Sequence, residues 1–135
     1  MMLEEQLRKY WFFNYTGGFS VKKKSRTVLE SLHYASEILE DKGNMLLLFP
    51  QGEIQSVYRS SFVFEKGTER VLSGNTDRIQ VVFMAALTDY FSSPKPGAYF
   101  YLEEYNGSMT SGIDIQDGYN DFYSRVINKH IQTPL

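Results

Sequence analysis

Two short, wholly apolar runs constrain most strongly how this chain can fold. Residues 45–49 read Met-Leu-Leu-Leu-Phe, and residues 81–87 read Val-Val-Phe-Met-Ala-Ala-Leu. Runs of this length and composition are typical of strands that are buried on both faces of a sheet. Both are much shorter than the roughly 18–20 residues that an apolar helix needs to span a membrane. We therefore expect a fold built around a sheet.

The segments between these runs have the apolar spacing of helices. Such alternation indicates an α/β fold with a layered, mainly parallel or mixed sheet flanked by helices. No linker or repeat suggests a boundary, so we expect a single domain over residues 1–135. Helices are predicted over residues 3–13, 28–39, 66–72 and 117–131, and further strands over residues 19–21 and 98–102.

Composition excludes several classes of chemistry. The chain has no cysteine, which removes disulfides, thiolate nucleophiles and cysteine-based metal sites. Its two histidines, His33 and His130, belong to no metal-binding or catalytic motif, so we predict no metal and no cofactor. The formal net charge of -2 gives no electrostatic reason to expect nucleic acid as a partner.

Two segments are candidates for binding a ligand. Residues 50–53, Pro-Gln-Gly-Glu, directly follow the first apolar run, and ligands of open α/β sheets bind beyond the carboxyl ends of strands. The same turn would also serve simply to end a strand. The basic run of residues 22–26 precedes a predicted helix, whose N-terminus would add to its attraction for phosphate or carboxylate. The alternative for this run is a solvated basic face.

Aromatic residues make up 16% of the chain, and four of them are consecutive at residues 10–13, Tyr-Trp-Phe-Phe. Amphipathic rings are favoured at interfaces with partner proteins and with membrane surfaces. This cluster therefore predicts either a contact with another chain, including a second copy of this one, or a peripheral contact with a membrane.

Four segments, taken in order, carry a more specific pattern. Residues 17–23 read Gly-Gly-Phe-Ser-Val-Lys-Lys, residues 48–55 read Leu-Phe-Pro-Gln-Gly-Glu-Ile-Gln, and residues 64–68 read Phe-Glu-Lys-Gly-Thr. Residues 81–86 follow as an apolar strand. The series resembles the glycerolipid acyltransferase family, the lysophosphatidic-acid (1-acylglycerol-3-phosphate) acyltransferases. Its blocks read Gly-x-x-Phe-Ile-Asp-Arg, Phe-Pro-Glu-Gly-Thr-Arg-Ser with a following Phe-x-Lys-Gly, and Val-Pro-Val.

The chain also departs from this family pattern. Gln51 stands where the family has glutamate, and Ile54 stands where it has an arginine. The first family block, Asn-His-x4-Asp, is absent, and His33 has Ile38 where that block needs its aspartate. In the family this histidine is the general base on the acceptor hydroxyl. The resemblance therefore implies the C-terminal portion of an acyltransferase, truncated at its N-terminus and inactive alone.

The resemblance implies acyl transfer in the full-length protein, from acyl-CoA or acyl-ACP to a hydroxyl of a glycerol-phosphate or lysophospholipid acceptor. It implies a cytoplasmic location, peripheral at the inner face of the membrane. Apolar surface that the missing N-terminal block would cover favours a homo-oligomer. The alternative is a non-catalytic module that binds lipid phosphate or another protein. The residues implied to bind the acceptor are Gly18, Lys23, Arg26, Pro50, Gln51, Gly52, Glu53 and Arg59.

Overall fold

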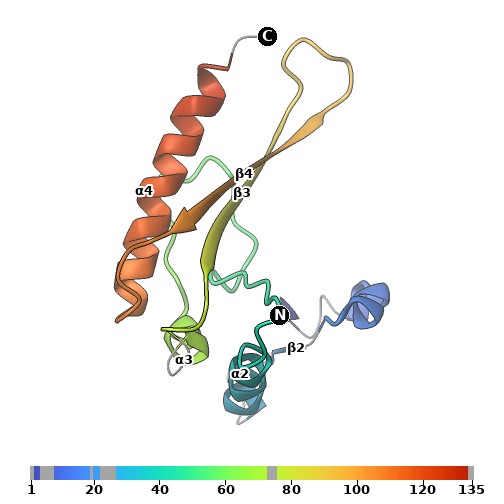
Figure 1. Ribbon diagram of the computed structural model, residues 1–135. Helices are drawn as coiled ribbons and strands as arrows, with labels where there is room; N and C mark the ends of the chain where they lie inside the picture. Colours follow the sequence, from blue (N-terminus) through green and yellow to red (C-terminus); the bar gives the residue numbers. More distant parts are fainter. Residues whose placement is uncertain (1, 4–7, 19, 22–26, 73–75, 134–135) are drawn as a thin grey trace. The chain divides into compact units, whose positions relative to one another are not determined.

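The computed structural model describes residues 2–3, 8–18, 20–21, 27–72 and 76–133, and these residues confirm a mixed α/β protein. The chain forms two compact units, Met1–Ile54 with Val63–Ile79, and Gln55–Phe62 with Gln80–Leu135. The single domain expected over residues 1–135 stays a prediction. The helices and strands are β1 (Met2–Leu3), the 3-10 helix η1 (Trp11–Thr16), β2 (Ser20–Val21), α2 (Thr27–Ile38), α3 (Gly67–Leu72), β3 (Val81–Asp89), β4 (Gly97–Tyr105) and α4 (Gly112–Ile131) (Figure 1).

The core of the first unit lies between α2 and α3, both of which the sequence predicted. Leu32 and Ala35 on α2 and Val71 on α3 are all buried, at 5%, 0% and 0% exposure. Gly67 begins α3 at a point where a Cβ atom would come within 3.1 Å of the Leu32 side chain. A glycine there lets the two helices approach closely, which is why a helix of six residues is sufficient to close this core.

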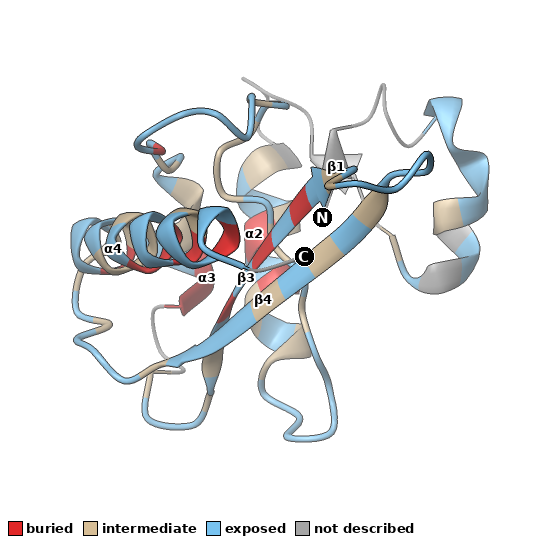
Figure 2. Ribbon diagram, turned by 90° about the horizontal axis from the view of Figure 1, so that it is seen from above, coloured by how far each residue is buried: buried red, intermediate tan, exposed pale blue. Residues whose placement is uncertain are grey.

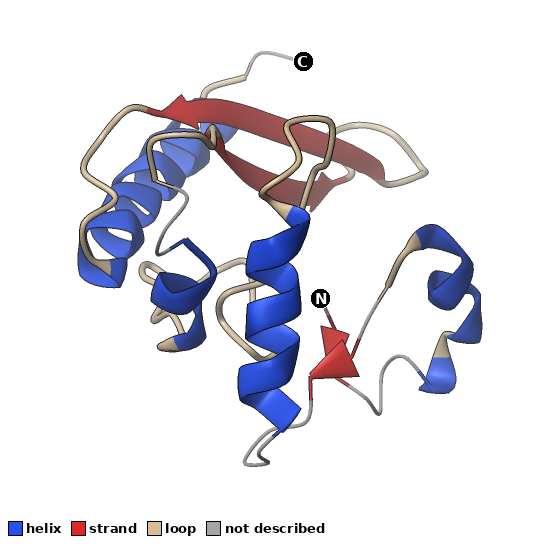
Figure 3. Ribbon diagram, turned by 60° about the horizontal axis from the view of Figure 1, so that its bottom comes forward, coloured by secondary structure: helices blue, strands red, loops and turns tan. Residues whose placement is uncertain are grey.

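The predicted strand over residues 45–49 is wrong. This segment has no regular secondary structure, as Figure 3 shows by its loop colour. Leu46 and Leu48 pack against the α2–α3 core, whereas Met45 and Phe49 are 90% and 56% exposed. The segment is therefore buried on one side only. An apolar run becomes a strand only where a neighbouring strand completes its backbone hydrogen bonds, and among the described residues none does so here.

The helix predicted over residues 3–13 is also wrong at its start. Met2–Leu3 form strand β1, which pairs in parallel with β2, Met2 opposite Ser20 and Leu3 opposite Val21. This pairing confirms the brief strand expected around residue 20. The aromatic cluster instead belongs largely to the 3-10 helix η1, which ends at Gly17 in the left-handed conformation, with φ of 79°.

The second unit is a β-hairpin with α4 against one of its faces (Figures 1 and 3). Strands β3 and β4 pair antiparallel along their whole length, from Val81 opposite Tyr105 to Asp89 opposite Gly97. Both strands were predicted, but the layered, mainly parallel sheet is not confirmed, because this main sheet is two-stranded and antiparallel. Burial of β3 alternates, so residues 81–87 are buried on one face and not on both (Figure 2).

Aromatic rings make the core of this second unit. Phe122 on α4 is 2% exposed, and its ring centroid lies 5.7 Å from that of Phe83 on β3. The Asn120 side chain fastens the segment 55–62 to α4, since its Oδ1 accepts from the Phe62 N–H at 2.7 Å and its Nδ2 donates to the Phe62 carbonyl at 3.0 Å. Helix α4 begins five residues earlier than predicted because the Ser111 hydroxyl caps it, accepting from the Asp114 N–H at 3.2 Å.

We predict that Phe122→Ala lowers the free energy of unfolding by about 3–5 kcal/mol, because it leaves a cavity between α4 and the hairpin. Phe100→Ala is the matched control, since Phe100 is 61% exposed and its removal should cost no more than about 0.5 kcal/mol. Urea denaturation measures both values. Equal costs for the two variants would contradict the placement of α4 on the hairpin.

Candidate functional site

The candidate turn after residues 45–49 is well defined. The Gly52 N–H donates to the Phe49 carbonyl at 3.3 Å, which closes a β-turn with proline and glycine at the positions they favour. The Glu65 N–H donates to the Pro50 carbonyl at 2.8 Å. This hydrogen bond brings together the Phe-Pro-x-Gly and Phe-x-Lys-Gly segments on which the family resemblance chiefly rests.

Gly52 is the residue that permits this arrangement. Its φ is 67°, and a Cβ atom there would lie 2.8 Å from Cγ of Glu65. Gln51 is half-buried and Glu53 is exposed. The side chains around the turn thus include two carboxylates, Glu53 and Glu65, so an anionic ligand there would need cations to offset their charge.

The other predicted site residues are distributed unevenly. The Gly18 N–H donates to the Phe13 carbonyl at 2.8 Å, and a Cβ atom at Gly18 would come within 2.7 Å of that same oxygen. Gly18 therefore closes the end of η1. Lys23 and Arg26 lie outside the described residues. Arg59 is exposed and belongs to the second compact unit, whereas residues 50–53 belong to the first.

A second site, which sequence reasoning missed, has His130 at its centre. This side chain is buried at 7% exposure near the end of α4. The Tyr101 hydroxyl lies 2.8 Å from His130 Nδ1, and Oδ2 of Asp89 lies 3.3 Å from His130 Nε2. The rings of Phe91 and Tyr99 cover the imidazole, with centroids 5.1 and 5.2 Å away. The imidazole of His130 thus contacts a carboxylate through one ring nitrogen and a hydroxyl through the other.

The electrostatics of this cluster keep Asp89 ionised at neutral pH. The Phe91 N–H donates to Oδ1 of Asp89 at 2.9 Å and lowers the pKa of that carboxyl, partial burial opposes the shift, and His130 lowers the pKa further. An ionised Asp89 can only accept a hydrogen bond, so we assign the ring proton of His130 to Nε2, the nitrogen that faces this carboxylate. Nδ1 is then the acceptor for the Tyr101 O–H.

The signal that pointed to this cluster was weak. His130 shares the apolar face of the helix 117–131, yet its position near the C-terminus also fits a cation that the helix dipole favours. Its partners come from two strands, 29 and 41 positions away in sequence, and no motif records such a separation. His33, by contrast, lies exposed and 3.7 Å from Glu37 on the next turn of its helix.

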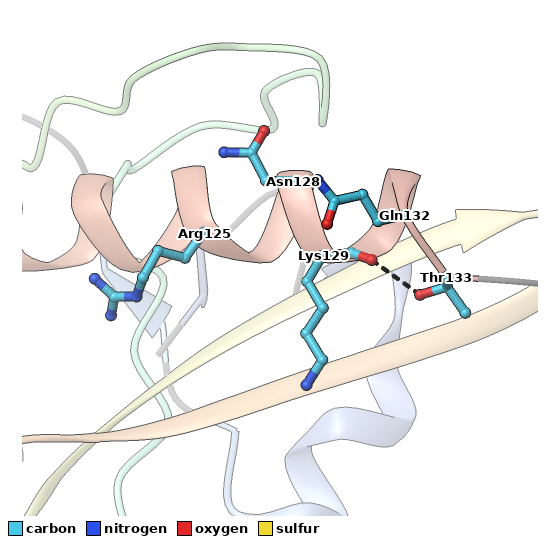
Figure 4. Close-up of a pocket in the computed structure, with 5 residues that line it drawn as sticks. All are labelled: Arg125, Asn128, Lys129, Gln132 and Thr133. Atoms are coloured by element: carbon cyan, nitrogen blue, oxygen red, sulfur yellow. Dashed lines mark hydrogen bonds between the residues drawn. The ribbon is translucent and has the colours of Figure 1, made fainter.

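One further polar depression among the described residues offers little chemistry. A shallow depression on α4 is lined by Arg125, Asn128, Lys129, Gln132 and Thr133 (Figure 4). Arg125 forms ion pairs with Asp121 and Glu103, which neutralise its charge, and the Thr133 hydroxyl donates to the Lys129 carbonyl at 3.0 Å. The described residues contain no group of three or more acidic or histidine side chains that could hold a metal ion.

No family model, no curated protein and no solved structure matches this chain. The acyltransferase relationship therefore stays a prediction. A search of the described helices finds none with the length and apolar character needed to cross a membrane.

We predict that Asp89 makes the free energy of unfolding depend on pH in the acid range. In the folded state the pKa of Asp89 is below its ordinary value of 3.8, so the unfolded chain binds the proton more tightly. The ionised carboxylate therefore stabilises the fold above pH 3.8, and this stabilisation is lost as pH falls through the lowered pKa of the folded state. The gap in urea midpoint between the wild type and Asp89→Asn should therefore narrow as pH falls below 3.8. A gap that stays constant over that range would contradict the shift.

Proposed function

We propose that this chain is the acceptor-binding part of an acyltransferase-like domain that acts on phosphorylated glycerolipids. The observation that carries the proposal is the hydrogen bond between the Glu65 N–H and the Pro50 carbonyl. It holds two motif-like segments side by side, although those two residues are 15 positions apart in sequence. A turn and a helix start joined in this way are suited to form one wall of a ligand site.

The remaining residues of the site would have distinct roles. Lys23 and Arg26 would neutralise the acceptor phosphate, since the described side chains at the turn carry negative charge. Gln51 would offer an amide in place of the family's carboxylate. In this proposal the complete domain would have a layered, mainly parallel or mixed sheet flanked by helices.

The family's reaction requires a general base from a sequence block that this chain lacks. In acyl transfer from acyl-CoA or acyl-ACP, the acceptor oxygen attacks the thioester carbonyl, the thiol leaves, and a base removes the hydroxyl proton. The sequence has no Asn-His-x4-Asp block to supply that base. The proposal therefore assigns acceptor binding to this chain and continuous turnover only to a protein in which such a base is present.

The exposed aromatic cluster favours a second candidate function, a non-catalytic module that lies on a lipid surface. Trp11 and Tyr15 are 63% and 82% exposed, and their rings contact each other at 5.9 Å. The Lys9 ammonium lies 5.4 Å from the Tyr10 ring centroid. Rings beside a cation are the combination that peripheral proteins place at the headgroup level of a bilayer. This function would put the chain at the cytoplasmic face of a membrane and needs no catalysis.

Binding to lysophosphatidate in vesicles tests the acceptor site. The double variant Lys23→Glu/Arg26→Glu should bind lysophosphatidate-containing phosphatidylcholine vesicles about tenfold or more weakly, because each cation near an anionic surface contributes about 1 kcal/mol. Lys42→Glu/Lys95→Glu is the matched control, since both lysines are exposed and lie outside the proposed site. Co-sedimentation measures the difference. Equal binding by both double variants would refute the acceptor site.

In the same series, Trp11→Ala separates the two functions. If the aromatic cluster is the membrane contact, this variant should lose binding to lysophosphatidate vesicles and to phosphatidylserine vesicles alike. An acceptor site alone predicts no change in either.

An acyl-transfer assay tests the absence of the family base. The chain incubated with acyl-CoA and lysophosphatidate should release no more than one equivalent of free CoA, because the family block that supplies the base for repeated transfer to the acceptor is absent from the sequence. Thiol titration measures the release, with an active lysophosphatidate acyltransferase as the positive control. Sustained release of CoA with formation of phosphatidate would show that the chain is a complete enzyme.

A further inference from the structure

The His130 cluster has the connectivity of an activated nucleophile. A hydroxyl lies on one nitrogen of the imidazole at 2.8 Å, and a carboxylate lies on the other at 3.3 Å. Nucleophile, base and orienting group in hydrogen-bond reach of one another are the signature of a side chain prepared for covalent catalysis. Here the three residues come from β4, α4 and the end of β3.

Burial in this cluster differs between its members. His130 is almost fully covered, whereas Tyr101 is half-buried and the Asp89 side chain is 43% exposed. The base is therefore screened from water, whereas the residue that carries the hydroxyl is partly exposed. The hydroxyl can also donate to a neutral imidazole and accept from a protonated one, so the contact survives when the proton moves.

We propose that Tyr101 is a base-activated nucleophile that accepts an acyl group from an acyl thioester. The choice of a thioester as donor rests on the proposed function, whereas the activation of the hydroxyl rests on the contacts of His130 and Asp89 alone. Tyrosine is among the residues that form covalent intermediates in enzymes.

The chemical step balances within the cluster. The Tyr101 oxygen attacks the thioester carbonyl as its proton passes to His130 Nδ1, and Asp89 stabilises the imidazolium that forms. The carbon–sulfur bond then breaks, and the leaving thiolate takes the proton back from His130. The products are an ester on Tyr101 and the free thiol, with His130 returned to its neutral form. One acyl group is taken up per chain, so this step requires no continuing turnover.

Acetylation of Tyr101 tests the proposal with two reagents. p-Nitrophenyl acetate probes the nucleophile itself, and acetyl-CoA probes the thioester donor. Mass spectrometry of peptides should find acetyl on Tyr101 with either reagent, faster than on Tyr58, which is 93% exposed and serves as the internal reference. Tyr101→Phe should abolish this label. Tyr34→Phe is the matched control, because Tyr34 is exposed on α2, outside the His130 cluster, and its loss should leave the rate unchanged.

Variants of the base and its orienting group complete the test. His130→Gln should slow acetylation of Tyr101 about 100-fold, the usual effect of a positioned general base. Asp89→Asn should slow it at least about tenfold, and Asp89→Glu should restore most of the rate by returning the carboxylate. Thermal unfolding verifies that each variant is folded. If His130→Gln does not fold, Asp89→Asn still tests the proposal, because it changes a partly exposed side chain to one of equal size.

The outcomes separate the two proposals. Acetylation of Tyr101 no faster than that of Tyr58, or a rate that neither His130→Gln nor Asp89→Asn changes, would overturn the nucleophile. Reaction with p-nitrophenyl acetate but not with acetyl-CoA would overturn the thioester donor. Binding to lysophosphatidate vesicles is independent of Tyr101, so loss of that binding in the Lys23→Glu/Arg26→Glu variant with acetylation intact would still support the proposed acceptor site.

Discussion

The contact between α4 and the β3–β4 hairpin determines what the second unit can do. An isolated two-stranded hairpin is marginal in water, so the buried face of α4 is what makes this one stable. The rings of Phe122, Phe83 and Tyr119 meet in edge-on and tilted pairs, a geometry that adds to the free energy from buried area. Because this packing sets the position of α4 along the hairpin, it also sets which strand residues face His130.

Much of the fold could be predicted from local pattern. The apolar spacing over residues 28–39 and 117–131 predicted α2 and α4, because a helix with one apolar stripe needs only its own sequence and a surface to cover. Residues 45–49 were misread for the opposite reason. An apolar pentapeptide is compatible with a strand or with an extended segment lying on a helical core, and only the partner decides. Leu3 likewise obeyed helical spacing yet pairs with β2.

The two candidate sites differ in how far sequence could reach them. Pro50 and Gly52 are close in sequence and favour a turn by their own backbone preferences, so the turn was found without knowledge of the fold. Its contact with Glu65 depends on how the chain folds back, which no local pattern predicts. The cluster of Asp89, Tyr101 and His130 depends on strand register and on the packing of α4, both of which are tertiary facts. The position of a single histidine near a helix end predicts neither the strand register nor the packing of α4.

The path of the chain through the two units has a practical consequence for dissecting the protein. Residues Gln55–Phe62 leave the first unit, join the second through Asn120, and the chain then returns to build α3. The backbone passes between the units three times, at residues 54–55, 62–63 and 79–80. No single cut, and no simple shortening from either end, releases one intact unit from the other. Dividing the chain at any one of these crossings would leave at least one unit without some of its residues.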